Sequence, residues 1–426
     1  DAPWARAYIE GRASERVGRY DDAERAYRQA LADQPTGEPA VALAELLTRL
    51  GRADEASVLW QAIVRAGQAQ RTGGAMSRAA RAAQALGQVR LSNSYFQTAA
   101  NLSPDDPQVH TRWGDLFLEK YNQAEARSSY ETALKADAQY VPAMIGLARS
   151  LADTNATAAE AAARQALAID PDQPDAWVLL ASEAMDASRR PDARAALEKL
   201  LTVNPRHVEA LALSAALAQI EDRTADVTRF TQQALAINPR NADVPRVIGE
   251  RVARMYRFDE AVRFLREAVT LDPENSRAQA SLGLHLLRTG DEAEARKALD
   301  AAFSKDSFDT VTYNLLSLMD TLDKFVTVEA KNLTIRMHEQ EVAVLQPYLV
   351  PLAEEALASG WQARWVAYAE GLSPRGHKVV DGFAAQGAEV DQAAEHVLKA
   401  MSDTETPQGL LAVLARLDIP MPPALS

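Results

Sequence analysis

The residues that could do chemistry are few and scattered in this sequence. The string closest to HExxH, the zinc motif with two histidines one helical turn apart and a water-activating glutamate, begins at His338. It continues Glu339-Gln340-Glu341-Val342, so valine stands where the second histidine is required. The five other histidines have no partner histidine at helical spacing. The sequence therefore predicts no metal ligands and no catalytic residues.

The sequence also has no motif for cysteine chemistry, for phosphate binding or for an activated serine. There is no cysteine, which excludes thiol catalysis, iron–sulfur clusters, disulfides and cysteine-bound zinc. No G-x-x-x-x-G-K-[ST] string occurs, and Gly18, Gly51, Gly87 and Gly290 are interpreted as turn residues rather than as a phosphate loop. The many serines have no histidine placed to activate them. We expect no cofactor, and the protein is interpreted as a non-enzyme.

Bulk composition restricts the partners. The net charge is −13, so a nucleic acid held by an excess of Lys and Arg is disfavoured. No run reaches the ~18 apolar residues of a membrane span. The chain begins Asp1-Ala2-Pro3 without Met, which suggests a removed leader or a cut chain. We expect an exported, periplasmic bacterial protein, with the cytoplasm as the alternative.

The elements that carry these residues repeat along the chain. Prolines at Pro171, Pro205, Pro239 and Pro273 recur at one constant spacing, each after a helix ending in Ala-Leu-Ala-Ile or a variant of it. Before each of the last three prolines lie two apolar-periodic helices separated by a short break. Small residues at three fixed positions let the paired helices approach, and each pair leaves an apolar face that only the next pair can cover. The spacing predicts a stacked array of helix pairs.

The repeat pattern resembles the tetratricopeptide family, whose period of about 34 residues equals the spacing of these prolines. Nine units agree with it from Trp4 to Asp306, so we predict an all-α, right-handed solenoid over 1–306. The resemblance implies that a peptide, a helix or another subunit binds on the concave wall formed by the first helices. The positions that form this wall in the family can be assigned here directly, and to within about one residue at the turn ADTNAT of the fifth repeat.

An apolar strip on this wall is the first candidate site. It comprises Met144, Leu151, Val178, Met185, Ala212, Ala216 and Ile220. Contiguous exposed apolar residues usually mark interaction sites, which favours a groove for a partner helix or extended segment. The alternative is that tight superhelical curvature or the C-terminal region covers the strip.

Charged wall residues form a second candidate set. They are Arg12, Arg49, Arg246, Arg254, Arg277 and Arg288. Because Asp243 and Glu250 stand among the later arginines, an ion-paired, solvated face is the favoured interpretation there.

After the array the pattern changes. Residues 307–360 are predicted to be a connector: a helix over 308–322, a β-hairpin in which Phe325 to Glu329 alternate before a turn at Ala330-Lys331-Asn332, and a second helix. Residues 361–426 are predicted to form a small helical cap and tail, beginning with a helix at WQARWVAYAEGL.

The segment 308–358 resembles the lead-in that joins a tetratricopeptide array to a gluzincin-like zinc peptidase domain in some bacterial proteins. That resemblance implies HExxH and a downstream glutamate as third ligand, for which WVAYAEGLS offers only Glu370. We therefore predict a scaffold that binds a protein partner, within a larger assembly. The alternative is the repeat part of a zinc peptidase, or a degenerate remnant, whose catalytic region is lost or lies outside this chain.

Overall fold

The computed structural model describes residues 2–330, 333–340, 342–343, 363–369, 377, 380–381, 384–385, 389–393 and 410–414. The chain divides into two compact units, Asp1–Asn314 and Leu315–Ser426. The predicted boundaries at 306/307 and 360/361 stay predictions.

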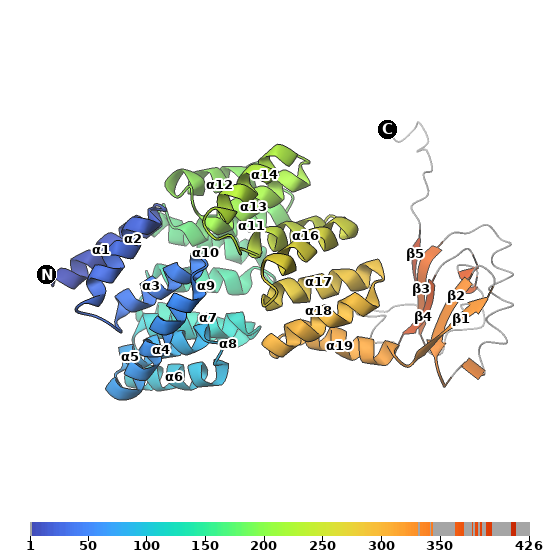
Figure 1. The fold of residues 1–426 in the computed structure, drawn as a ribbon, viewed down its shortest axis with the longest axis horizontal. Helices are drawn as coiled ribbons and strands as arrows, with labels where there is room; N and C mark the ends of the chain where they lie inside the picture. The colour runs from blue at the N-terminus through green and yellow to red at the C-terminus, as the bar shows by residue number, and fades with distance from the viewer. Residues whose placement is uncertain are drawn as a thin grey trace. The chain divides into compact units, whose positions relative to one another are not determined.

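The first unit is an array of antiparallel helix pairs that follow one another along the chain (Figure 1). The paired helices are α1 (Pro3–Arg16), α2 (Tyr20–Leu31), α3 (Glu38–Arg49), α4 (Ala53–Gln70), α5 (Gly73–Ala85), α6 (Val89–Leu102), α7 (Pro107–Glu119), α8 (Gln123–Ala136), α9 (Val141–Leu151), α10 (Ala156–Ile169), α11 (Pro174–Asp186), α12 (Arg190–Val203), α13 (Val208–Ile220), α14 (Thr224–Leu235), α15 (Asp243–Ala253), α16 (Phe258–Leu271), α17 (Ser276–Thr289) and α18 (Glu292–Lys305). A further helix, α19 (Thr310–Leu322), contains the division between the two units. The predicted solenoid of nine pairs is confirmed, with α1–α2 as repeat 1 and α17–α18 as repeat 9.

Small residues bring the paired helices together. Gly114 of α7 and Gly146 of α9 both lie against the Tyr130 ring of α8, which is fully buried. A Cβ atom at Gly114 would lie 2.6 Å from the ring, so only glycine permits this approach. The Tyr130 hydroxyl donates to Asp115 Oδ1 at 2.8 Å, which satisfies its polar end. One aromatic side chain thereby joins two successive repeats.

Successive first helices also contact one another. From α3 to α17, each first helix touches the next first helix two elements along the chain. Their shared surface is continuous, and we call it the inner wall: the face of α1, α3, α5, α7, α9, α11, α13, α15 and α17 on which side chains of different repeats meet.

The second unit contains a sheet. The hairpin of β1 (Phe325–Ala330) and β2 (Leu333–His338) is antiparallel, pairing Phe325 with His338, and confirms the predicted hairpin. The other strands are β3 (Ala363–Ala369), β4 (Glu389–Ala393) and β5 (Leu410–Leu414), and the order is β1-β2-β4-β3-β5. β4 runs parallel to both β2 and β3, and β5 is antiparallel to β3.

The helical cap predicted for 361–426 is therefore wrong at β3, β4 and β5, whereas the described residues 377, 380, 381 and 384 are helical. The segment predicted as its first helix forms β3 instead. A short apolar run is ambiguous between a buried helix and a buried strand, and Trp365, Val366 and Tyr368 are residues that strands favour. The candidate ligand Glu370 and the predicted second connector helix beyond 343 lie outside the described residues.

Candidate partner-binding surface

Ion pairs between repeats line the inner wall. Arg112 of α7 donates to Glu38 of α3 at 2.7 Å, across 74 residues and two repeats. Arg78 of α5 lies 3.7 Å from the same carboxylate. Burial opposes ionisation of Glu38, but the two guanidiniums more than offset it and lower the pKa of its carboxyl. Arg81 of α5 likewise donates to Glu45 of α3 at 3.0 Å.

The same two-repeat spacing recurs near the other end of the wall. Arg251 of α15 contacts both Asp186 and Ser182 of α11. Side chains two repeats apart can meet only where the first helices converge, so these contacts show that the inner wall is strongly curved. Curvature of this kind buries whatever lies between the converging helices.

Four of the seven residues of the predicted apolar strip are buried. Val178, Met185, Ala212 and Ala216 are exposed by 5%, 9%, 1% and 0%. These four residues are thus not exposed, which agrees with the alternative of coverage by tight curvature, and the role of the strip in partner binding stays a prediction.

The remaining strip residues are half-buried. Met144 and Leu151 pack against the core cluster of repeats 5 and 6. Their assignment to the wall rested on a repeat pattern that slips near Thr154. Ile220, at the end of α13, is also half-buried.

The predicted charged residues are mostly paired. Arg49 donates to Glu15 at 2.5 Å, and Arg12 lies 3.7 Å from the same residue. Arg246 lies 2.9 Å from both Asp243 and Glu250, the carboxylates expected beside it.

The last three arginines differ from one another. Arg254 pairs with Asp186, next to Arg251. Arg288 lies over the Phe258 ring at 5.2 Å from its centroid. Arg277 is exposed at the start of α17.

A carboxylate row on the central wall was missed from the sequence. Asp175, Glu209 and Asp243 stand near the starts of α11, α13 and α15, each one repeat from the next. Their recurrence at the same spacing as the prolines is the sequence pattern that would have predicted them. We call these three residues the acidic row.

The members of the acidic row differ in their partners. Arg149 donates to Asp175 at 2.6 Å, and Arg246 pairs with Asp243 as described above. Glu209, between them, is an exposed side chain whose surroundings inside the curved wall raise the pKa of its carboxyl, chiefly through loss of hydration. Arg149 opposes that rise, while Asp175 and Asp243 add to it. A cation brought to Glu209 would relieve this repulsion.

His207 lies beside the row at the start of α13. Its Nδ1 accepts a hydrogen bond from the backbone N–H of Ala210 at 3.3 Å. Burial lowers the pKa of this imidazole to about 4, Asp175 opposes the shift, and Arg49 and Arg149 add to it. The ring is neutral near pH 7, so it caps the helix as an acceptor and contributes no positive charge to the wall.

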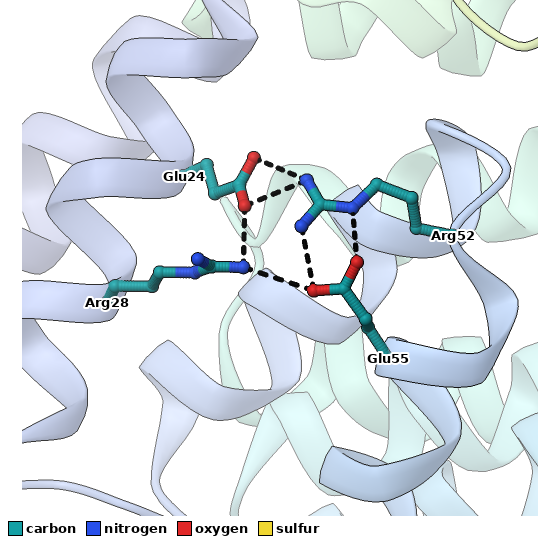
Figure 2. Close-up of polar contacts among 4 residues, drawn as sticks. All are labelled: Glu24, Arg28, Arg52 and Glu55. Carbon is teal, nitrogen blue, oxygen red and sulfur yellow. Dashed lines mark hydrogen bonds and ion pairs between the residues drawn. The ribbon is translucent and has the colours of Figure 1, made fainter.

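The outer helices carry a separate ion-pair network, shown in Figure 2. Arg52 donates to Glu24 at 2.8 Å and to Glu55 at 2.6 Å, and Arg28 bridges the same two carboxylates at 2.7 and 3.2 Å. These residues join repeats 1 and 2 through α2, α4 and the turn before α4. Because all four side chains are mutually satisfied, this network is assigned to repeat stacking rather than to binding.

The described part of the chain contains neither a cluster of metal ligands nor a membrane-spanning helix. No three His, Asp or Glu side chains come together there as metal ligands. Among the described helices, none has the length and apolar character needed to cross a membrane. His338, which begins the nearest zinc-like string, ends strand β2.

Family models match most of the array. Two models described as tetratricopeptide repeat match residues 16–76 and 253–317, and 77–141, 111–174 and 178–219. Together they cover more than half of the chain. In the second unit, residues 350–412 match a model described as an MRM3-like substrate binding domain. No curated protein matches the sequence.

Solved structures match the chain at low sequence identity. One is described as the APC/C hetero-tetramer Cut9-Hcn1, with 16% identity, a TM-score of 0.47, and coverage of 71% of this chain and 60% of that chain. This chain thus spans less than two thirds of that one. Another is a tetratricopeptide repeat protein from Parabacteroides merdae, with 16% identity, a TM-score of 0.41, and coverage of 57% and 97%.

Proposed function

Because the chain belongs to the tetratricopeptide-repeat family, we propose that it is a protein-interaction scaffold whose inner wall binds an extended segment of a partner protein, within a larger assembly. The segment presents lysine or arginine side chains to the acidic row. The position of Glu209 in the acidic row is the observation that supports this proposal. Glu209 is exposed on the wall between two ion-paired carboxylates, Asp175 and Asp243, each one repeat away.

Charge on the central wall supports the choice of a basic partner. The first helices of repeats 5 to 8 (α9, α11, α13 and α15) carry six carboxylates against three arginines. Burial raises the pKa of two of these carboxyls, Glu183 and Glu209. The whole chain also carries a net charge of −13. A basic segment would thus be attracted over a distance and then ion-paired inside the curve.

Crosslinking identifies the partner. A photoreactive residue at position 209 is expected to capture a protein that the same residue at Glu131, exposed on the outer helix α8, does not capture. The captured protein should crosslink through a segment rich in Lys or Arg.

Charge reversal then tests the mechanism with the identified partner. Glu209→Lys should weaken binding by about tenfold or more, which corresponds to the ~1.4 kcal/mol of a modest ion pair. Glu131→Lys makes the same charge change on the outer face and should leave affinity within about twofold at physiological salt, where the Debye length is about 8 Å. If both variants lost the same affinity, the loss would be due to the change in net charge alone, which would contradict a binding site on the inner wall.

A further inference from the structure

Distant repeats touch through the turn of the first helix pair. The Tyr20 hydroxyl at the start of α2 donates to the backbone carbonyl of Arg206 at 2.8 Å, across 186 residues. The Arg206 guanidinium lies over the Tyr20 ring, 4.8 Å from its centroid, and donates to the Gly18 carbonyl at 3.4 Å. Asn204, between α12 and α13, is buried against the same turn. The α1–α2 pair thus meets the α12–α13 connection.

Two further contacts repeat this sequence separation. Lys120, after α7, donates to Asp306, after α18, at 3.0 Å and across 186 residues. Gly51, between α3 and α4, approaches the Asn238 side chain between α14 and α15, at almost the same separation. All three separations are close to five and a half repeats. In repeats 1, 2 and 4, the turn within the helix pair therefore lies against a chain segment that follows a second helix about five and a half repeats later.

We infer that these contacts form a clasp, comprising Gly18, Tyr20, Asn204 and Arg206 with the Gly51–Asn238 and Lys120–Asp306 contacts, which closes the side of the superhelix and must open before an extended segment can reach the inner wall laterally. The opening step rests on the proposed function, whereas the clasp itself does not. Successive turns that touch leave no lateral gap between them at these points. A polypeptide must then thread along the axis or wait for the turns to separate.

The chemistry of the clasp suits repeated opening. It consists of a few hydrogen bonds, one cation–π contact and one ion pair, with Tyr20 and Asn204 as its buried side chains. Such polar contacts exchange readily for contacts with water, unlike an apolar interface. The adjacent pairs of the array remain stacked when the turns separate, because their apolar contacts are made within and between neighbouring repeats.

Two glycines provide a matched test of the clasp. Gly18 and Gly87 occupy equivalent turns with φ of 77° and 73°, so alanine strains both turns alike. A Cβ at Gly18 would collide with the Asn204 side chain, whereas nothing lies within 4 Å of one at Gly87. Gly18→Ala should therefore disrupt the clasp, and Gly87→Ala should only strain its own turn.

Spin-label distances measure the opening directly. The chain has no cysteine, so Asp21→Cys with Thr202→Cys introduces the only two thiols, both at exposed positions on either side of the clasp. We expect one narrow distance distribution in the parent and in Gly87→Ala, and a longer or broader one in Gly18→Ala. A broad distribution in the parent, or identical distributions in all three proteins, would overturn the clasp.

Thiol labelling tests access to the wall without any partner. A single cysteine is placed at Glu209, or at Glu131 as the outer-face control, and its reaction with a maleimide carried on a long polymer is timed. Labelling at position 209 should accelerate severalfold with Gly18→Ala and stay unchanged with Gly87→Ala, while position 131 reacts equally in every background. Equal rates at position 209 in all backgrounds would overturn lateral gating even where the distances confirm the clasp. Neither readout involves a basic segment, so failure here is distinct from failure of the proposed binding at Glu209.

Discussion

Single residues set how closely the helices of this array pack, and the glycines facing Tyr130 are the clearest case. Gly146 and Gly114 present bare backbone to a ring that has no exposed surface. A methyl group there has no free volume to enter, so the ring or the helix axis must shift.

Gly146→Ala is expected to destabilise the first unit by about 2–3 kcal/mol, the upper range for overpacking a dense core. Gly74→Ala is the matched control. It also lies in a first helix, but the nearest atom to its new Cβ is the flexible Arg78 side chain at 3.4 Å. That variant should be neutral or stabilising by up to ~1 kcal/mol because alanine favours helix. Urea unfolding followed by circular dichroism measures both, and equal stabilities would contradict tight packing around Tyr130.

His285 makes stability depend on pH. The ring is buried on α17, stacks on Phe258, and its Nδ1 atom has no hydrogen-bond partner. Burial, and secondarily Arg288, lower the pKa of His285 to about 4, while Glu250 opposes the shift. The folded state therefore binds this proton less readily than the unfolded chain, whose histidine has a pKa near 6.5. The stabilisation is complete above pH 6.5 and is lost as the pH falls towards 4.

Between pH 7 and pH 5 this residue should cost about 2 kcal/mol of unfolding free energy. His285→Leu keeps an apolar side chain against Phe258 without a proton to bind, so its stability should fall less over the same range. His207, whose pKa is also about 4, provides a second contribution that persists in the variant. The measurement is the difference between the two pH profiles of chemical unfolding, and parallel profiles would refute the assignment to His285.

At the scale of elements, the turns within the helix pairs share one backbone position with positive φ. Gly18, Gly51, Gly87 and Gly290 occupy it in four repeats. Tyr121, Ser188, Asp222 and Tyr256 occupy it in four others, and the last three of these stand one repeat apart. A side chain at positive φ costs about 1–2 kcal/mol. The two tyrosines are also exposed, so little packing offsets that cost at these turns.

Tyr256→Gly is accordingly expected to stabilise the protein by ~0.5–1 kcal/mol, the strain relieved less the entropy that glycine adds to the unfolded chain. The side chain is 83% exposed and contacts Phe258 edge-on at 5.9 Å, so its removal costs little. Tyr256→Ala loses the same ring contact but keeps the strain, and should give no gain. Thermal unfolding of the pair separates the two effects, and an equal response would attribute the change to the ring.

Sequence periodicity was sufficient to predict the helix pairs of the array, but it was insufficient to predict strands β3, β4 and β5 of the second unit. The proline spacing and the small residues facing Tyr27, Tyr130 and Leu265 encode helix pairing locally, so the array could be predicted residue by residue. Strand β3 could not, because its apolar run pairs with residues from 389 to 393 and 410 to 414 that no local pattern connects to it.

At the largest scale, the curvature of the first unit explains why four residues of the predicted strip are buried although the predicted array is right. Position in a repeat specifies which face of a helix a residue occupies, but exposure depends on how far successive pairs rotate. Arg251 of α15 contacts Ser182 of α11 across two repeats, and between these helices Val178 and Ala212 are almost fully buried. Such a rotation accumulates from many small packing differences. The charged residues that reach past this apolar layer remain accessible, which favours the acidic row over the strip.

Contacts between turns should also change how the solenoid unfolds. In an open array each repeat is stabilised only by its neighbours, so the terminal pair frays first. Here Tyr20 and Asn204 link repeat 1 to the connection between repeats 6 and 7, and opening of α1–α2 must break that contact too.

We therefore expect amide hydrogens of α2 to exchange almost as slowly as those of the central helices, and Asn204→Ala to accelerate α2 selectively. That variant removes the side chain lying 3.5 Å from both the Tyr20 hydroxyl and the Glu15 carbonyl. Helix α9 should keep its exchange rate, because its stacking against α8, α10 and α11 is untouched. Exchange followed by mass spectrometry resolves these helices. Uniform acceleration would indicate a global loss of stability, and fast exchange of α2 already in the parent protein would show that the turns are not coupled in solution.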